Sequence, residues 1–300
     1  MARFCRAGNG PDMLPAMVAK PGVAIVGPGR LGSALAIELS RAGYRVSELV
    51  CRQGSPSGSR VRKLARRLHA RLSFPQTACL DAEVIWFCVP DREISSAART
   101  LATRGPWRGK TAFHASGALT SAELGALKRK GARVASVHPL MSFVRGAVPP
   151  LKGVPFALEG DRGALRVGAR IVHDFGGNAF SIPAKNKAAY HAWGAFASPL
   201  AIALLATAEQ VANAAGLSPL EARRKMLPIL EQTLENYRRW GAAGSLSGPL
   251  VRGDAEIIAK HLEILGPISG AKEVYLALSR SALRLIPVEE RRKLEKALRD

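Results

Sequence analysis

Features that mark several common classes of protein are missing from this sequence. The four cysteines form no C-x-x-C pair and no zinc-ligand spacing, which argues against a disulfide framework and against a metal site. Residues 1–20 contain no apolar stretch of the length that a signal peptide needs, and we expect them to form a disordered extension. Reduced cysteines without a signal peptide favour a cytoplasmic protein.

Acidic residues are scarce, because 23 Asp and Glu stand against 44 Lys and Arg, and the net charge is +21. The excess of positive charge is greater in residues 1–183 than in residues 184–300. Such a surplus suits a polyanionic dinucleotide, and it would also suit nucleic acid. The chain has no recognisable DNA-binding motif and no aromatic residues interleaved with its basic ones, so nucleic acid is not an expected partner.

One long run, residues 188–208, lacks charged residues and has the length of a membrane span. It consists mostly of alanine and includes His191, Ser198 and Pro199, so insertion into a bilayer would gain little. A helix that is apolar on all sides is also expected at the centre of a helical domain. We therefore predict a buried helix and no membrane association.

Short apolar runs alternate with helical patterns over residues 21–183, which predicts βαβ units and a mostly parallel sheet of the Rossmann type. Strands are expected at 23–26, 45–51, 83–89, 110–114, 133–137, 154–158 and 179–182, and helices at 31–42, 60–72, 121–130 and 163–175. After Pro183 only helices are expected, at 185–215, 219–240, 254–265, 270–284 and 288–299, with a Gly/Ser-rich connector at 241–248. The prediction is thus an α/β Rossmann domain over 21–183 followed by an all-α domain over 184–300.

A glycine motif of the form G-x-G-x-x-G directly follows the first predicted strand and opens the first predicted helix. It comprises Gly27, Pro28, Gly29, Arg30, Leu31 and Gly32. In dinucleotide-binding domains the first glycine allows a tight turn, the second lets the backbone approach the pyrophosphate, and the third lets helix and strand pack closely. The phosphates then lie at the helix N-terminus, among unpaired N–H groups. The motif therefore predicts a dinucleotide site.

The acidic residue that NAD enzymes place after the second strand is absent here. That position holds Cys51 and Arg52, and Glu48 lies too early, within the strand. A guanidinium at this place would pair with a 2′-phosphate, which favours NADP(H) over NAD(H). The alternative is that Arg52 is one of many surface arginines.

Further candidates follow the later strands, at the edge of the sheet where ligands of open α/β folds bind. Val89, Pro90 and Asp91 come after one strand, and Ser116 comes after the next, where its hydroxyl could contact the nicotinamide amide or the substrate. His138 occupies the equivalent position one strand further along, and a structural hydrogen bond is an almost equal explanation for it. His114 is expected inside the core.

Six segments occur in order and at family-like spacing: GPGRLGSALA, WFCVPD, HASGAL, SVHPLMSF, KAAYHAW and LSGPLVRGD. Over about residues 21–290 the chain resembles bacterial proteins that join a Rossmann-like domain to a helical domain of unknown function. That family is similar to ketopantoate reductase, pyrroline-5-carboxylate reductase, prephenate dehydrogenase and the 6-phosphogluconate or 3-hydroxyisobutyrate dehydrogenases. The resemblance implies a helical domain of the 6-phosphogluconate dehydrogenase C-terminal type, which forms a homodimer and closes the pocket for a small-molecule substrate.

The related dehydrogenases use a lysine with an asparagine four residues later, and the matching positions here hold Lys187 and His191. The resemblance implies that Lys187 stabilises an oxyanion or donates a proton beside the hydride acceptor. Spacing of four residues puts both side chains on one helix face, and a continuous helix would bring Ser198 to that face as well. For His191, a role as a core residue with its hydrogen bonds satisfied is an equal alternative. The change from asparagine to histidine at this position also puts in question whether the substrate is a 3-hydroxy acid or ketopantoate.

In the loop before the third predicted helix of the helical domain, Ser247 and Arg252 are candidate substrate ligands, and an Arg252–Asp254 ion pair is an equal alternative. The sequence as a whole predicts NADPH-dependent reduction of a small, carboxylated carbonyl or imine compound. Reduction of ketopantoate specifically, and a dinucleotide-binding regulator without turnover whose basic 60–71 helix contacts nucleic acid, are the alternatives.

Overall fold

The structure is a computed structural model that describes residues 19–54, 58–144, 149–285 and 291–299. All but the last two residues of the extension predicted for 1–20 lie outside this part. The chain divides into two compact units, Met1–Gly194 and Ala195–Asp300. The division falls later than the predicted boundary at Pro183, because the first helix after Pro183 packs Lys187 and Tyr190 into the first unit.

The first unit is built on one eight-stranded sheet, whose strands lie in the order β3-β2-β1-β4-β5-β6-β7-β8. The strands are β1 Val23–Val26, β2 Val46–Val50, β3 Arg71–Ser73, β4 Val84–Phe87, β5 Thr111–His114, β6 Arg133–Pro139, β7 Pro155–Gly160 and β8 Asn178–Ser181. Strands β1 to β6 are parallel, β7 is antiparallel to β6, and β8 is parallel to β7. The sequence order therefore reverses between β1 and β4, which is where open α/β sheets bind ligands.

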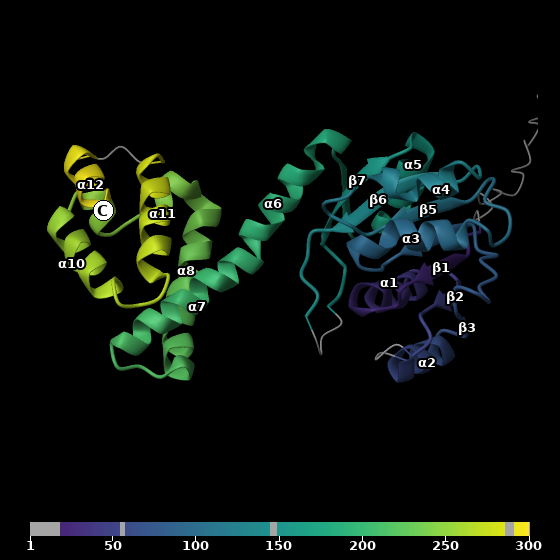
Figure 1. Cartoon of the computed structure of the whole chain (residues 1–300), viewed down its shortest axis with the longest axis horizontal. Coiled ribbons are helices and arrows are strands. Elements are labelled where there is room, and N and C mark those ends of the chain that lie inside the picture. The colour runs from purple at the N-terminus through teal and green to yellow at the C-terminus, as the bar shows by residue number, and fades with distance from the viewer. Residues whose placement is uncertain (1–18, 55–57, 145–148, 286–290, 300) are drawn as a thin grey trace, which may run out of the picture. The chain divides into compact units, whose positions relative to one another are not determined.

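Helices cover both faces of this sheet (Figure 1). They are α1 Arg30–Arg41, α2 Gly58–Arg67, α3 Asp91–Leu101, the 3-10 turn η1 Ser121–Leu124 with α4 Gly125–Lys128, and α5 Arg162–Asp174. Side chains of β1 alternate between two apolar clusters: Val23 and Ile25 pack with α1, α2 and α5, whereas Ala24 and Val26 share a cluster with α3, η1 and α4. This two-residue alternation explains why β1, covered on both faces, is a continuous apolar run.

Three predicted elements differ in the structure. The helix predicted at 60–72 ends at Arg67, and its last residues belong to the edge strand β3. The helix predicted at 185–215 is interrupted at Ser198, whose backbone (φ −133, ψ −81) is not helical, because Pro199 has no N–H to continue the hydrogen-bond ladder. Much of the connector predicted at 241–248 is helical up to Ser245, although Gly241 (φ 67, ψ −172) breaks the helix there.

The remaining elements are also helical: η2 Ala184–Asn186, α6 Lys187–Ala197, α7 Pro199–Ala214, α8 Pro219–Ser245, α9 Pro249–Arg252, α10 Ala255–Leu265, α11 Ala271–Leu283 and α12 Arg291–Ala297. The short helix α9 lies in a stretch that was predicted to be a loop, and the first residues of the helix predicted at 288–299 lie outside the described part. The buried core of the second unit comes from the last three helices and the residue after them, with Ile258, Leu262, Leu276, Leu283, Leu294 and Leu298. Among its described residues α7 has none that is buried, and α8 buries only Ala222.

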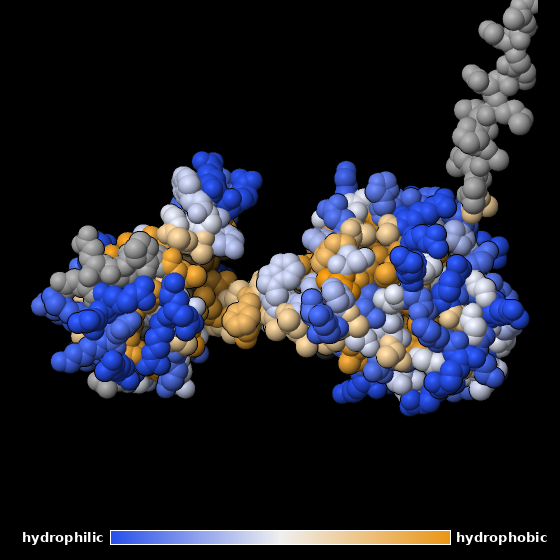
Figure 2. Space-filling view, turned by 90° about the horizontal axis from the view of Figure 1, so that it is seen from above, coloured by the Kyte–Doolittle hydropathy of each residue, from blue (hydrophilic) through white to orange (hydrophobic). Residues whose placement is uncertain are grey.

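The expectation that the apolar run at 188–208 is buried is wrong for the isolated chain. The helical stretch Ala184–Ala214 is long and apolar enough to cross a membrane, and none of its most apolar 18-residue window is buried. Phe196 is 71% exposed and Ile202 64%. Apolar side chains, orange in Figure 2, lie at the surface where α6 and α7 run. Within the part of the chain that the structure describes, this apolar stretch is therefore left largely uncovered.

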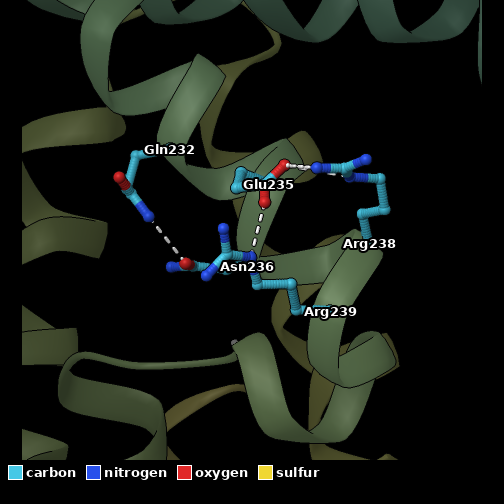
Figure 3. Close-up of polar contacts among 5 residues, drawn as sticks. All are labelled: Gln232, Glu235, Asn236, Arg238 and Arg239. Carbon is cyan, nitrogen blue, oxygen red and sulfur yellow. Dashed lines mark hydrogen bonds and ion pairs between the residues drawn. The ribbon is translucent and has the colours of Figure 1, made fainter.

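Helix α8 is amphipathic, and its polar stripe is tied together by its own side chains (Figure 3). Glu235 accepts hydrogen bonds from Arg238 and from Arg239 Nε (2.5 Å), and Gln232 donates to Asn236 (2.7 Å). The other face of α8 carries exposed apolar side chains: Leu227, Ile229, Leu234, Tyr237 and Trp240. Although α7 and α8 contact each other, this face of α8, like most of α7, stays exposed within the described part of the chain.

Candidate functional site

The three glycines of the motif have different surroundings in the turn. Gly27 has φ +82, and a Cβ on it would lie 2.6 Å from Val89 Cγ1. A Cβ on Gly32 would lie 2.6 Å from Gly27 O, so the third glycine lets α1 pack against the turn. A Cβ on Gly29 would meet only Gly27 O, at 4.0 Å, which leaves the second glycine open to a ligand. Because the first turn of α1 has no acidic residue, its free N–H groups can receive a pyrophosphate.

A cavity of about 410 Å³ lies beside this turn, between the ends of β1, β2 and β4. Six predicted cofactor residues line it: Gly27, Pro28, Gly29, Arg52, Val89 and Pro90. Arg30 and Leu31 begin α1, where Arg30 is exposed. Arg52 follows β2 and forms an ion pair with Glu93 of α3, Nη1 to Oε1 at 3.2 Å. The shape, the open backbone at Gly29 and the guanidinium suit the adenosine and pyrophosphate half of a dinucleotide.

Ser116 and Asp91, two further predicted cofactor residues, hold the loop after β5. The Ser116 hydroxyl donates to Asp91 Oδ2 (2.7 Å) and accepts from the N–H groups of Ala118 (3.2 Å) and Leu119 (2.9 Å). The Ser116 N–H donates to Nδ1 of His114 (3.1 Å), which leaves His114 Nε2 to donate to a backbone carbonyl. Burial lowers the pKa of His114 to about 4, so this imidazole is neutral and structural, as expected.

Lys187 is 1% exposed, and its ammonium points into the first unit. Nζ donates to Ser116 O (2.8 Å) and to Ser136 Oγ (2.6 Å), and Ser136 Oγ also donates to Ser116 O (2.9 Å). Burial lowers the pKa of Lys187 to about 8, although the carboxylates of Glu159 and Asp91 counteract this. The lysine thus ties α6 to the ends of β5 and β6 through the Ser116 loop.

His138 and His191 meet over Gly117. A Cβ on Gly117 would lie 2.9 Å from His138 Nε2 and 2.9 Å from His191 Cδ2, so glycine is required there. Tyr190, one position before His191, has its hydroxyl 2.7 Å from His138 Nδ1. Burial lowers the pKa of His138 to about 3 and raises that of Tyr190 to about 12. When this phenol donates to Nδ1, the imidazole proton lies on Nε2, the edge that faces Gly117.

Three predicted substrate residues belong to the second unit. Ser198 is the N-cap residue of α7 rather than a member of α6, so its predicted alignment with Lys187 on one continuous helix is wrong. Ser247 is exposed. Arg252 Nε donates to Asp254 Oδ2 (2.9 Å), which is the ion pair named as the alternative to a substrate clamp.

Glu93 and Tyr190 were missed by the sequence reasoning. Each reaches its partner from a distant part of the chain, 41 residues away for Glu93 and 52 for Tyr190. Glu93 does stand in the first turn of a helix that opens at the ligand-binding edge, and a first-turn carboxylate after Pro90 was a usable signal. Tyr190 lies within the KAAYHAW segment, between the two residues that were singled out.

The strand order, the glycine turn and its cavity define a Rossmann-type domain, which a helical domain follows. Comparison with known proteins agrees. A model of a Rossmann-like domain matches residues 9–139, and a model of a domain of unknown function, DUF2520, matches residues 154–282. The chain therefore combines a Rossmann-like domain with a DUF2520 domain, as the resemblance predicted. No curated protein matches the chain significantly.

Solved structures share this two-domain fold along nearly their whole length. A candidate NADP oxidoreductase from Bacteroides fragilis has a TM-score of 0.71 at 18% identity, over 88% of this chain and 98% of its own. A Thermotoga maritima protein has a TM-score of 0.68 at 25% identity, over 92% and 100%. An imine reductase from Myxococcus stipitatus in complex with NADP⁺ has a TM-score of 0.63 at 16% identity, over 88% and 94%. The likenesses confirm the predicted fold class.

Proposed function

We propose that the chain is an NADP(H)-dependent oxidoreductase that reduces a small carbonyl or imine substrate carrying a carboxylate. One observation carries the proposal: an open glycine turn and an arginine after β2 line the same cavity at the switch point of the sheet. The NADP⁺ complex of the Myxococcus stipitatus imine reductase, which has the same fold, supports the choice of cofactor. A reduced nicotinamide, when bound, supplies a hydride.

The residues of the chain divide between holding the dinucleotide and preparing the reacting end. The N–H groups at the start of α1 receive the pyrophosphate, and Arg52 contacts the 2′-phosphate. Asp91 and Ser116 keep the loop after β5 rigid, and His138 presents Nε2–H beside Gly117. A neutral imidazole in this position can donate a hydrogen bond to a substrate oxygen or nitrogen without changing its charge.

Two groups compete for the role of proton donor. The resemblance implies Lys187, and a pKa of about 8 suits proton transfer near neutral pH. Both of its described hydrogen bonds, however, are directed to Ser116 and Ser136, so a substrate would have to displace them. We propose that Lys187 acts as a positioning residue in the state described here and that His138 contacts the substrate. The roles first predicted for His191, Ser198, Ser247 and Arg252 remain predictions.

Equilibrium titration with NADPH and NADH, followed by turnover, tests the proposed function. We expect micromolar binding of NADPH, and NADPH oxidation with at least one member of a panel of 2-keto acids and cyclic imines. Oxidation with ketopantoate alone would select that specific alternative. Dinucleotide binding without turnover, together with DNA binding that weakens steeply as salt rises, would favour the regulator instead. If neither dinucleotide binds at millimolar concentration, the proposal is wrong.

We further propose that a second copy of the chain covers the apolar faces of α7 and α8, as the resemblance implies. An exposed continuous apolar surface of this extent is rare on a monomer. The neighbouring Glu235 network keeps the other face of α8 polar, so the two faces are distinct. Light scattering should give twice the chain mass, and Ile229→Glu should give the monomer, whereas Gln232→Glu on the polar face should not. Flotation with lipid vesicles would instead indicate a membrane.

A further inference from the structure

We propose that Glu93 is a specificity-determining residue, which competes with the 2′-phosphate for Arg52 and gives the site an acceptor for a ribose diol, so that the site binds NADH as well as NADPH. The proposal deepens the proposed function and rests on it. In this proposal Glu93 takes the place of the acidic residue that is missing after β2.

The sheet order brings the two residues together. Strands β2 and β4 flank β1 on either side, and their carboxyl ends open onto the same cavity. Arg52 follows β2, and Glu93 lies in the first turn of α3, which follows β4. They are in contact, 3.2 Å from Nη1 to Oε1, and both line the cavity beside the glycine turn. A carboxylate therefore reaches the neighbourhood of the ribose-binding position from the opposite neighbour of β1.

Glu93 is the better fixed partner of the pair. Its side chain is 22% exposed, whereas that of Arg52 is 74% exposed. The Glu93 N–H donates to Pro90 O (2.8 Å), which fixes the start of the helix, and the N-terminal end of α3 favours a negative charge. Arg52 can therefore swing toward a ligand, while the carboxylate remains at the edge of the cavity.

The charges set opposite preferences for the two cofactors. A 2′-phosphate gains the guanidinium of Arg52 but approaches the Glu93 carboxylate, and like charges at this range repel each other even when water screens them. A ribose diol donates hydrogen bonds, and a carboxylate is the acceptor that NAD-binding sites use for it. A single Arg–Glu contact also leaves most of the five guanidinium donors free. The pair thus narrows the difference between the two affinities without abolishing either.

Dinucleotide titration of four proteins tests the inference: the wild type, Glu93→Gln, Arg52→Gln and the double variant. We expect the wild type to bind NADPH and NADH with affinities within about tenfold of each other. Glu93→Gln should tighten NADPH by about fivefold and weaken NADH by about fivefold, because it removes repulsion and a strong acceptor together. Arg52→Gln should weaken NADPH by more than about tenfold and leave NADH nearly unchanged.

Asp81→Asn is the matched control. It removes one negative charge just before β4, at the N-terminal end of the strand, whereas the cavity lies at the carboxyl ends of the strands. It should leave the ratio of NADPH affinity to NADH affinity unchanged. A ratio that changes by less than twofold in Glu93→Gln, or that moves toward NADH, overturns the inference while leaving the proposed function intact. Loss of both dinucleotides from the wild type would remove the proposed function, and the inference with it.

Discussion

Replacing Lys187 by methionine separates the free-energy cost of burying its ammonium from the contribution of that ammonium to turnover. The side chain is 1% exposed, and burial lowers its pKa from 10.5 to about 8. A shift of this size corresponds to about 3 kcal/mol against the charged form at neutral pH. Methionine fills nearly the same volume without a charge. It loses two hydrogen bonds, worth about 1 kcal/mol each, but Ser136 Oγ still donates to Ser116 O.

We therefore expect Lys187→Met to unfold in urea at pH 7 with a free energy equal to that of the wild type or about 1 kcal/mol higher. Turnover with a substrate found by the panel should fall by about a hundredfold or more, because the loop after β5 loses its anchor to α6. Lys185→Met, on an exposed lysine two residues earlier, is the control and should change neither quantity. A protein that keeps a costly charge does so for function rather than for stability.

The pH dependence gives a second readout with a definite sign. Below pH 8 Lys187 is charged in both states, and the folded wild type carries the whole cost of burial. Between pH 8 and 10.5 only the unfolded chain keeps the proton, so the wild type gains stability relative to Lys187→Met, by about 3 kcal/mol in total. If Lys187→Met loses more than about 2 kcal/mol at pH 7, or if the difference does not change with pH, the reasoning about a costly buried ammonium is wrong.

Three further predictions concern the rest of the site. Gly29→Ala should keep the stability of the wild type and lose dinucleotide affinity, whereas Gly27→Ala, at φ +82, should cost about 2 kcal/mol of unfolding free energy in a denaturant titration. Tyr190→Phe should leave the fold intact but remove the hydrogen bond that fixes the tautomer of His138. We expect a changed tautomer ratio by ¹⁵N NMR of the imidazole, and a changed pH–rate profile in turnover assays. The folded state protonates His114 only near pH 4, while the unfolded chain does so at 6.5, so this group should lower the stability by about 3 kcal/mol as the pH drops through that window. His114→Gln should remove this contribution and leave the similar one of His138.

Much of the first unit could be predicted because its signals are local. The apolar run at Val23–Val26, the glycines after it and the helix that follows lie next to one another in the sequence, so periodicity and turn chemistry identify them. The edge strand β3 was missed because three residues, one of them arginine, carry too little pattern to distinguish them from the end of the basic helix α2. Nor does hydrophobic pattern reveal that β7 runs antiparallel to β6.

The candidate site was less accessible to prediction because its contacts are made across the fold. Spacing correctly suggests that Lys187 and His191 share a helix, yet the first is buried and the second exposed, and only the packing of α6 on the sheet decides that. The pairing of Glu93 with Arg52 depends on the strand order and not on any motif. The interruption at Ser198 is different, because Pro199 was visible in the sequence and should have ended the helical extrapolation.

The scarcity of buried residues in α7 and α8 has a thermodynamic consequence. Two helices that exclude so little water within their own chain gain most of their apolar stabilisation only when something else covers them. If that partner is an identical chain, mass action couples folding to association, and the melting temperature rises with the amount of protein in the cuvette. Dilution alone would then lower the stability of the folded protein.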